Sequence, residues 1–131
     1  MISVLTDDDR VYGLGARQRV PSYYYAFENG GFECSPERTL GTYSVYNSID
    51  DKTDPYHYWT TLVKFGIGRA TYDASQEIRN EHITREEGVA LVHRYDQEFP
   101  RKYFTEFLEY LSMCEDEFFE IADSFRSPHL W

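Results

Sequence analysis

Apolar side chains recur at helical spacing through most of the second half of the chain. Intervals of three and four positions separate them in four segments: residues 58–63, 91–95, 103–111 and 118–125. Residues three and four positions apart share one face of an α-helix, so each segment predicts an amphipathic helix with one buried face. We therefore expect a mainly α protein of four to five short helices in a compact bundle or array.

Capping signals predict where the first helices begin and end. Asp54 has the side chain of an N-cap, and Pro55 suits the first helical position, where a missing N–H group costs nothing. Gly66 and Gly68 are expected to end this helix. A second, shorter helix is expected to start near Asp73, with Ala74 and Ile78 on one face and Gln76 completing a box-like pair with Asp73.

Three further helix starts follow in the sequence. Thr84 and Glu87 have the spacing of a capping box, with the hydroxyl at the N-cap and the carboxylate at the third helical position. Pro100 is expected to open the next helix. The last helix is expected from about Glu115 to Phe125, with Cys114 at its N-cap.

The first part of the chain has no comparable periodicity. Residues 1–52 are rich in Tyr and Gly, and we expect an irregular segment that packs on a helical domain of residues 53–131. Residues 11–15 and 23–27 could form short strands, Asn29-Gly30-Gly31 is a turn signal, and residues 42–49 alternate loosely with a period of two. A short β-hairpin is therefore compatible with this segment.

Composition excludes several classes of function. The chain has 131 residues and a net charge of −10, which argues against nucleic-acid binding and against an anionic membrane surface. No apolar run is long enough to span a bilayer, and the first residues lack the pattern of a signal peptide. Cys34 and Cys114 stand far apart, as isolated thiols do in a reducing compartment. We expect a cytoplasmic protein.

The segment from Lys64 to Gly88 holds the candidate chemistry. Gly66-Ile67-Gly68 lacks the third glycine of a dinucleotide-binding motif and follows a helix instead of a strand. It is either a helix C-cap or a turn whose backbone N–H groups approach an anion beside Arg69. For Lys64, Arg69 and Arg79, ordinary surface ion pairing is the alternative to ligand binding.

Two carboxylates in the same segment have alternative interpretations. Asp73 and Glu77 are four positions apart, so they could work as an acid–base pair or hold Mg²⁺. A capping Asp followed by a solvated Glu explains them as well. The histidines show no ligand spacing with one another or with the cysteines, so we expect no zinc site. The histidines are His57, His82, His93 and His129.

One set of positions, spread in order along the chain, carries a family resemblance. The set includes Asn47-Ser48-Ile49-Asp50, Lys64 to Thr71, Asp73-Ala74, Glu77-Ile78-Arg79, Ile83 to Gly88, Val92, Tyr95-Asp96, Phe99-Pro100, Phe107-Leu108 and Arg126 to Trp131. Through these positions the sequence resembles the C-terminal part of the N-acetyl sugar amidotransferases, from about residue 23 to the end and most clearly over residues 43–131. These are bacterial enzymes of surface-polysaccharide and pseudaminic-acid pathways.

The resemblance implies an ATP-pyrophosphatase type of enzyme. Such enzymes activate the acetamido group of a sugar with ATP, and ammonia from a glutaminase partner then yields an acetamidino group. The Ser-Gly-Gly-x-Asp-Ser type of loop that grips ATP belongs to the N-terminal domain of the family, and this chain has nothing like it. ATP and Mg²⁺ are therefore expected only with that domain, and the chain is expected to be a C-terminal fragment.

Two hypotheses follow. In the first, the helical domain supplies substrate or partner contacts to a sugar amidotransferase, acts with an ATP-binding domain and a glutaminase subunit, and is inactive alone. In the second, it is a non-catalytic module that docks onto a protein through its Gly66–Arg79 surface. Homo-oligomerisation is compatible with both, and no catalytic residue is assigned. The candidate binding residues are Lys64, Gly66, Gly68, Arg69, Asp73, Glu77 and Arg79.

Overall fold

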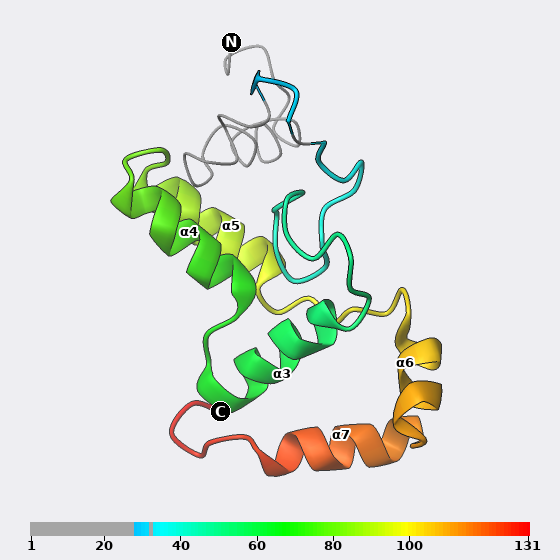
Figure 1. Cartoon of the computed structure of the whole chain (residues 1–131). Helices are drawn as coiled ribbons and strands as arrows, with labels where there is room; N and C mark the ends of the chain where they lie inside the picture. Colours follow the sequence, from blue (N-terminus) through cyan, green and yellow to red (C-terminus); the bar gives the residue numbers. More distant parts are fainter. Residues whose placement is uncertain (1–27, 32) are drawn as a thin grey trace.

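The computed structural model describes residues 28–31 and 33–131, and residues 54–124 form five helices joined by loops (Figure 1). The described part contains no β-strand, so the prediction of a mainly α protein is confirmed. No helix within it is long and apolar enough to cross a membrane. The helices are α3 (Asp54–Phe65), α4 (Arg69–Arg79), α5 (Arg85–Tyr95), α6 (Phe104–Leu111) and α7 (Glu115–Ser124).

Helices α4 and α5 form an antiparallel pair with a core of its own (Figure 1). The small side chains of Ala70 and Ala74 on α4 are almost fully buried, which lets the two helix backbones approach closely. Leu91 and Tyr95 from α5 complete the contact. Tyr43 from the loop before α3 also enters this core and is fully buried.

Helices α3, α6 and α7 surround a second core that is mainly aromatic. The rings of Tyr56 and Phe107 stack with centroids 4.0 Å apart, and Trp59 meets Phe99 edge to face at 4.9 Å. Offset stacking and edge-to-face contacts are the favoured arrangements of aromatic pairs. The high aromatic content of the sequence is thus used to join three short helices, each too short to be stable alone.

The first two predicted helix starts need correction. Helix α3 begins one residue earlier than expected, with Thr53 at the N-cap and Asp54 as the first helical residue. Helix α4 begins at Arg69, so the prediction of a start near Asp73 is wrong. Gly68 precedes it in an extended conformation, and a carboxylate from a distant part of the chain supplies the cap. No local pattern signals that arrangement.

The start of α6 also differs from the prediction. Pro100 is fully buried but does not open the helix, which begins four residues later at Phe104 after a turn at residues 102–103. The other two starts are confirmed. Thr84 and Glu87 make both hydrogen bonds of a capping box at α5, and α7 begins at Glu115 directly after Cys114.

The predicted strands at residues 11–15 and 23–27 lie outside the described residues. Residues 42–49, whose alternation is compatible with a strand, form bends and turns instead. Thr42, Tyr43, Ser44, Val45 and Tyr46 are all buried in succession, so both sides of this loop are covered. The pattern therefore reflects burial and not a pleated strand.

Candidate functional site

Gly66 and Gly68 connect α3 to α4, and each has a different role. Gly66 has a φ of 70° and its N–H group donates to the carbonyl of Leu62, which makes it a left-handed C-cap of α3. Gly68 has a φ of −97° and is buried. The C-cap interpretation is correct for Gly66, whereas Gly68 starts the next helix instead of ending the previous one.

The side chain of Asp96 caps α4 from the end of α5. Its carboxylate accepts hydrogen bonds from the N–H groups of Gly68 at 3.1 Å and Thr71 at 3.0 Å, and from the Thr71 hydroxyl at 2.8 Å. The first N–H groups of a helix have no partner within the helix, and a negative charge at that end is favourable. Two of the backbone donors that could approach an anion, those of Gly68 and Thr71, are thus already used by Asp96.

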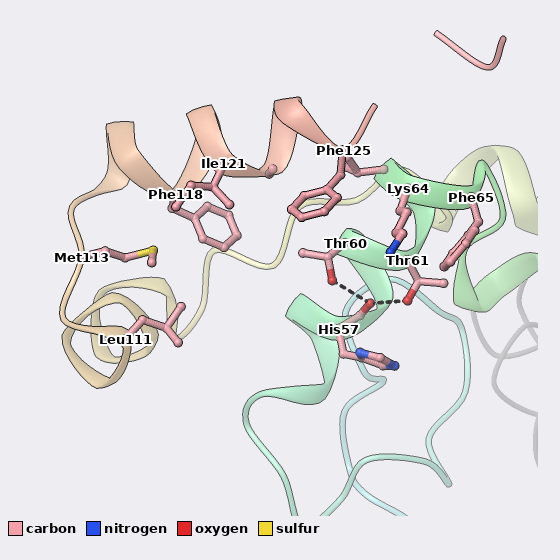
Figure 2. Close-up of a pocket in the computed structure, with 12 residues that line it drawn as sticks. His57, Thr60, Thr61, Lys64, Phe65, Leu111, Met113, Phe118, Ile121 and Phe125 are labelled. Carbon is pink, nitrogen blue, oxygen red and sulfur yellow. Dashed lines mark hydrogen bonds between the residues drawn. The ribbon is translucent and has the colours of Figure 1, made fainter. Parts of the chain in front are cut away.

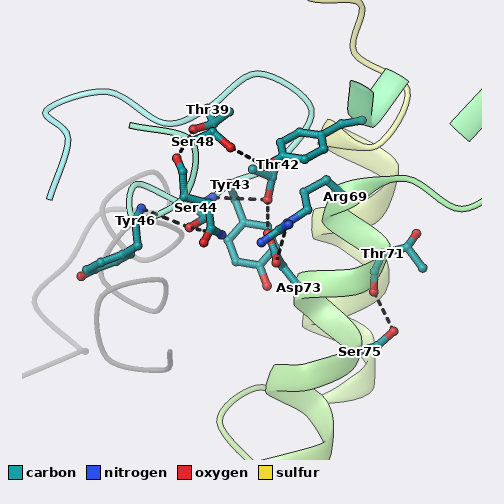
Figure 3. Close-up of polar contacts among 12 residues, drawn as sticks. Thr39, Thr42, Tyr43, Ser44, Tyr46, Ser48, Arg69, Thr71, Asp73 and Ser75 are labelled. Atoms are coloured by element: carbon teal, nitrogen blue, oxygen red, sulfur yellow. Dashed lines mark hydrogen bonds and ion pairs between the residues drawn. The ribbon is translucent and has the colours of Figure 1, made fainter. Parts of the chain in front are cut away.

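Arg69 is held in place by its own helix. Its Nε atom donates to Asp73 at 3.0 Å, one turn later, and the second oxygen of Asp73 accepts from the Thr42 hydroxyl at 2.6 Å. Figure 3 shows this chain of contacts between α4 and the loop of residues 39–48. Asp73 is buried, so it is neither a helix cap nor a solvated carboxylate.

The guanidinium of Arg69 lies between two tyrosine rings. Its central carbon is 5.2 Å from the ring centroid of Tyr58 and 5.2 Å from that of Tyr72. Tyr58 is fixed by a hydrogen bond with the Ser48 hydroxyl, and burial raises the pKa of Tyr58, with its contacts to Ser48 and Arg69 acting in the opposite direction. Tyr72 is 53% exposed, so the site opens to solvent on that side.

Within the described residues, Nε is the only Arg69 atom that donates a hydrogen bond. The terminal Nη1 and Nη2 groups are therefore oriented but free to bind oxygens from outside. A planar guanidinium with two such groups matches the geometry of a phosphate or a carboxylate. This is the arrangement that could bind an anionic ligand.

Glu77 lies one turn beyond Asp73 and is also buried. One of its carboxylate oxygens accepts a hydrogen bond from the Tyr43 hydroxyl at 3.0 Å. The two carboxylates share one face of α4, as the spacing predicts, but they face the loop that contains Thr42 and Tyr43. They anchor this loop to α4, and the interpretation of Glu77 as a solvated residue is wrong.

The remaining two candidate residues lie apart from this cluster. Lys64 is exposed in the last turn of α3, and its ammonium is 5.3 Å from the ring centroids of Phe65 and of Phe125. Arg79 is exposed at the last position of α4. The structure thus brings together Arg69, Asp73 and Glu77, with Gly68 beside them, and leaves Lys64 and Arg79 outside. In the described part, no three His, Cys, Asp or Glu residues are grouped to hold a metal.

Sequence reasoning does not find several residues of this site. Thr42, Ser48 and Tyr58 belong to segments that precede Lys64, and only Ser48 is among the positions that match the sugar amidotransferases. Asp96 has the same kind of prior signal, because Tyr95-Asp96 is also among these matching positions. What joins these residues is tertiary contact between α4, the end of α5 and the loop of residues 39–48.

A second set of contacts joins the loop before α3 to the segment that follows α5. The guanidinium of Arg38 donates to both carboxylate oxygens of Glu98 at 2.6 Å, and Gly41 N–H donates to Glu98 at 3.0 Å. Arg38 also lies over the ring of Tyr95, 4.5 Å from its centroid. Burial raises the pKa of Glu98, but the hydrogen bonds and charge of Arg38 and the Gly41 N–H outweigh it and hold that pKa below its ordinary value.

Comparison with known proteins identifies the family. Residues 37–131, more than half of the chain, match the family model described as "LPS biosynthesis protein WbpG-like, C-terminal domain". No curated protein sequence matches the chain. The matched range contains α3 to α7 and the loop that binds Asp73 and Glu98. The chain therefore belongs to the family of WbpG-like C-terminal domains of lipopolysaccharide (LPS) biosynthesis proteins.

Proposed function

We propose that this domain contributes substrate contacts to the ATP-dependent amidation of an N-acetyl sugar and is inactive alone. Its membership in an LPS biosynthesis family supports a saccharide substrate. In this function it acts with an ATP-binding domain, which supplies ATP and Mg²⁺, and with a glutaminase subunit, which supplies ammonia. These reactants place the reaction in the cytoplasm.

The proposal rests on how the guanidinium of Arg69 is held and on which of its nitrogens have hydrogen bonds. Asp73 holds the Nε side of the guanidinium, Tyr58 and Tyr72 flank its faces, and the terminal nitrogens remain without hydrogen bonds in the described part of the chain. A side chain fixed in this way loses little conformational entropy when it binds an anion. Its role is to bind the phosphate or carboxylate of the sugar substrate.

Calorimetric titration with a UDP-N-acetylhexosamine tests this role. We expect binding heat with the 131-residue chain and none with Arg69→Ala. Arg79→Ala is the matched control, because it removes an exposed arginine from the same helix and should leave the heat unchanged. Arg69→Lys separates charge from geometry, since it keeps a cation but loses the planar pair of donors.

Asp73 loses an ion-pair partner in Arg69→Ala, so circular dichroism must show that the variant is folded. In that case, unchanged binding heat in Arg69→Ala contradicts the role of Arg69. If the wild-type chain gives no binding heat, sugar binding by this domain is contradicted. That result favours the second function, a protein-interaction module.

Two exposed apolar side chains support the second function, a protein-interaction module. Ile67 is 54% exposed and Tyr72 is 53% exposed, and both lie on the Gly66–Arg79 surface. Exposed apolar side chains that gather on one surface are typical of a contact with another protein or domain. Co-purification with the ATP-binding domain of a WbpG-like protein tests this function, and it should be lost in Ile67→Glu but kept in Val89→Glu, which alters an exposed apolar residue on α5.

A further inference from the structure

A pocket of about 360 Å³ lies between the loop before α3 and the segment that joins α5 to α6. Its volume is within the range of about 300–1,000 Å³ that small-molecule sites occupy. Arg69 does not line the pocket, but Ser48 does, and the Ser48 hydroxyl is hydrogen-bonded to Tyr58, whose ring lies against Arg69. The pocket is therefore a separate cavity that Ser48 and Tyr58 connect to the Arg69 site. Its lining residues come from three segments: 35–40, 48–56 and 100–103.

Charged side chains of both signs line this pocket in equal number. A ligand with a net charge gains little from a site whose charges balance. An uncharged ligand with many hydroxyl groups can use side chains of both signs, because each hydroxyl is both a donor and an acceptor. The acidic side chains are Glu37, Asp50 and Asp51, and the basic ones are Arg38, Lys52 and Lys102.

Three of these side chains have hydrogen-bonding capacity that the described residues do not use. The carboxylate of Asp50 has no hydrogen bond or ion pair in the described part of the chain. Asp51 accepts from Thr53 through Oδ1, whereas its Oδ2 atom accepts from none of the described residues. Lys102 donates to Glu37 at 2.6 Å, which leaves further N–H donors of its ammonium. The pocket thus offers both acceptors and donors to a ligand.

A buried hydroxyl also lacks a partner at this pocket. Tyr56 lines the pocket and is buried, and its hydroxyl has no hydrogen-bond partner among the described residues. Burial raises the pKa of Tyr56, and the Tyr103 N–H group acts in the opposite direction without the geometry of a hydrogen bond. Buried polar groups are nearly always paired, so a polar partner from outside the chain is expected there.

The larger groove between α3 and α7, of about 440 Å³, offers a polar ligand fewer partners. Its walls are mainly apolar, and no carboxylate is among the described residues that line it. The hydroxyls of Thr60 and Thr61 in its wall already donate to the carbonyl of His57 (Figure 2). A ligand rich in hydroxyl groups therefore fits the pocket beside Tyr56 better than this groove.

We propose that the pocket beside Tyr56 binds the uncharged pyranose ring of an N-acetylated saccharide. Its hydroxyl groups donate to Asp50 and Asp51 and accept from Lys102, and its acetamido methyl group packs on Ile49, which is 52% exposed. The choice of an N-acetylated sugar rests on the proposed function, whereas the balance of charges in the pocket is independent of it. The pocket then supplies the contacts to the sugar ring, and Arg69 supplies those to the phosphate or carboxylate.

Nuclear magnetic resonance of the ¹⁵N-labelled 131-residue chain tests the proposal with the methyl glycosides of N-acetylglucosamine, N-acetylgalactosamine and N-acetylmannosamine. These probes carry no phosphate or carboxylate for Arg69. We expect at least one of them to cause saturable shifts in the backbone amide signals of residues 48–53 and 101–103. If none of the three causes a saturable shift, the proposal is overturned. Shifts confined to other parts of the chain overturn it as well.

Asp50→Ala tests the contact of the carboxylate with the sugar. It should weaken binding of the active glycoside at least about tenfold, because it removes an acceptor that the described residues leave unused. Asp50 is exposed, so its removal leaves no buried group unpaired. Glu120→Ala is the matched control, since it removes an exposed carboxylate from α7, outside the pocket, and should leave the affinity unchanged. Unchanged affinity in Asp50→Ala overturns the proposal.

Arg69→Ala separates this inference from the proposed function. It should keep the binding of the glycoside, which has no anionic group. If the heat of UDP-N-acetylhexosamine persists in Arg69→Ala and the glycoside shifts residues 48–53 and 101–103, the role of Arg69 is contradicted and the pocket is supported. If that heat is lost in Arg69→Ala and no glycoside causes a shift, the role of Arg69 is supported and the pocket is overturned.

Discussion

The carboxylate of Asp96 lies so close to Gly68 that no larger residue fits at that position. Gly68 N–H donates to Asp96 at 3.1 Å, and a Cβ atom at position 68 would lie 2.4 Å from the Asp96 Oδ1 atom. Because the φ of Gly68 is −97°, glycine is not needed for its backbone conformation. It is needed for the close approach of the carboxylate that caps α4.

This relationship predicts strong coupling between the two positions. Asp96→Ala removes three hydrogen bonds from a buried helix start and should lower the free energy of unfolding by about 1–3 kcal/mol. Gly68→Ala should cost a similar amount in the wild type, through the clash, but much less in Asp96→Ala, where the clash is absent. The measurement is a double-mutant cycle by urea unfolding, with an expected coupling of about 1 kcal/mol or more.

Gly66→Ala is the matched control for that cycle. Gly66 has a φ of 70°, so a Cβ atom there costs about 1–2 kcal/mol through backbone conformation, and it would also lie 3.3 Å from the Leu130 side chain, far from Asp96 in sequence. Gly66→Ala should therefore destabilise the protein by the same amount with or without Asp96→Ala. If the effects of Gly68→Ala and Asp96→Ala are simply additive, the proposed contact between them is not what requires glycine.

The contrast between the two glycines also shows how far the sequence predicts this fold. Helical periodicity predicts the α class, and local caps predict α5 and α7, because Thr84 and Cys114 are adjacent in sequence to what they start. The start of α4 could not be predicted in this way, since its cap comes from Asp96, 28 positions after Gly68. The sequence predicts a start near Asp73 because Gln76, three positions later, completes a box-like pair with it.

The candidate site was predicted in part for the same reason. Spacing alone predicts that Asp73 and Glu77 share one face, and the structure agrees; Arg69 joins them because α4 begins four residues earlier than predicted. Whether that face meets solvent or protein depends on the loop of residues 39–48, whose loose alternation indicates a strand that the structure does not contain. Its contacts from Thr42 and Tyr43 bury Asp73 and Glu77, whereas the terminal nitrogens of Arg69 have no hydrogen bond within residues 28–31 and 33–131.

Cys114 offers a way to improve a helix start. It has the extended conformation of an N-cap, but its side chain makes no capping hydrogen bond to α7. Cys114→Ser introduces a hydroxyl that can accept from the N–H group of Glu117, and we expect a gain of about 1 kcal/mol in the free energy of unfolding. Cys34→Ser is the control, because Cys34 starts no helix and should give no gain. A gain in both variants would point to a general effect of removing thiols.

The proposed function predicts that the 131-residue chain does not turn over ATP. The sequence has no Ser-Gly-Gly-x-Asp-Ser type of loop, and the free donors of Arg69 can bind a phosphate without activating it. A phosphate-release assay with ATP, Mg²⁺ and a UDP-N-acetylhexosamine should match the rate without protein. Steady turnover that disappears in Arg69→Ala would overturn the proposal, because it would assign the chemistry to this domain alone.

The pair of Arg38 and Glu98 predicts a dependence of stability on pH. The pKa of Glu98 is lower in the folded protein than its ordinary value, so the pair stabilises the fold above that ordinary value, about 4.3. This contribution is lost as the pH falls through the folded pKa, when the carboxyl becomes protonated. Glu98→Gln should lower the free energy of unfolding by about 1–3 kcal/mol at pH 7, and the difference from wild type should shrink below about pH 4.

Urea unfolding of both proteins between pH 7 and pH 3 measures this difference. Glu37→Gln is the matched control: Lys102 lowers the pKa of Glu37 through a hydrogen bond and its charge, but that pair is exposed to solvent. Exposed ion pairs contribute little to stability, so Glu37→Gln should behave nearly as the wild type at every pH. A Glu98→Gln difference that stays constant down to pH 3 would mean that the hydrogen-bond geometry at this position, and not the charge of Glu98, holds the loop of residues 38–42 on the end of α5.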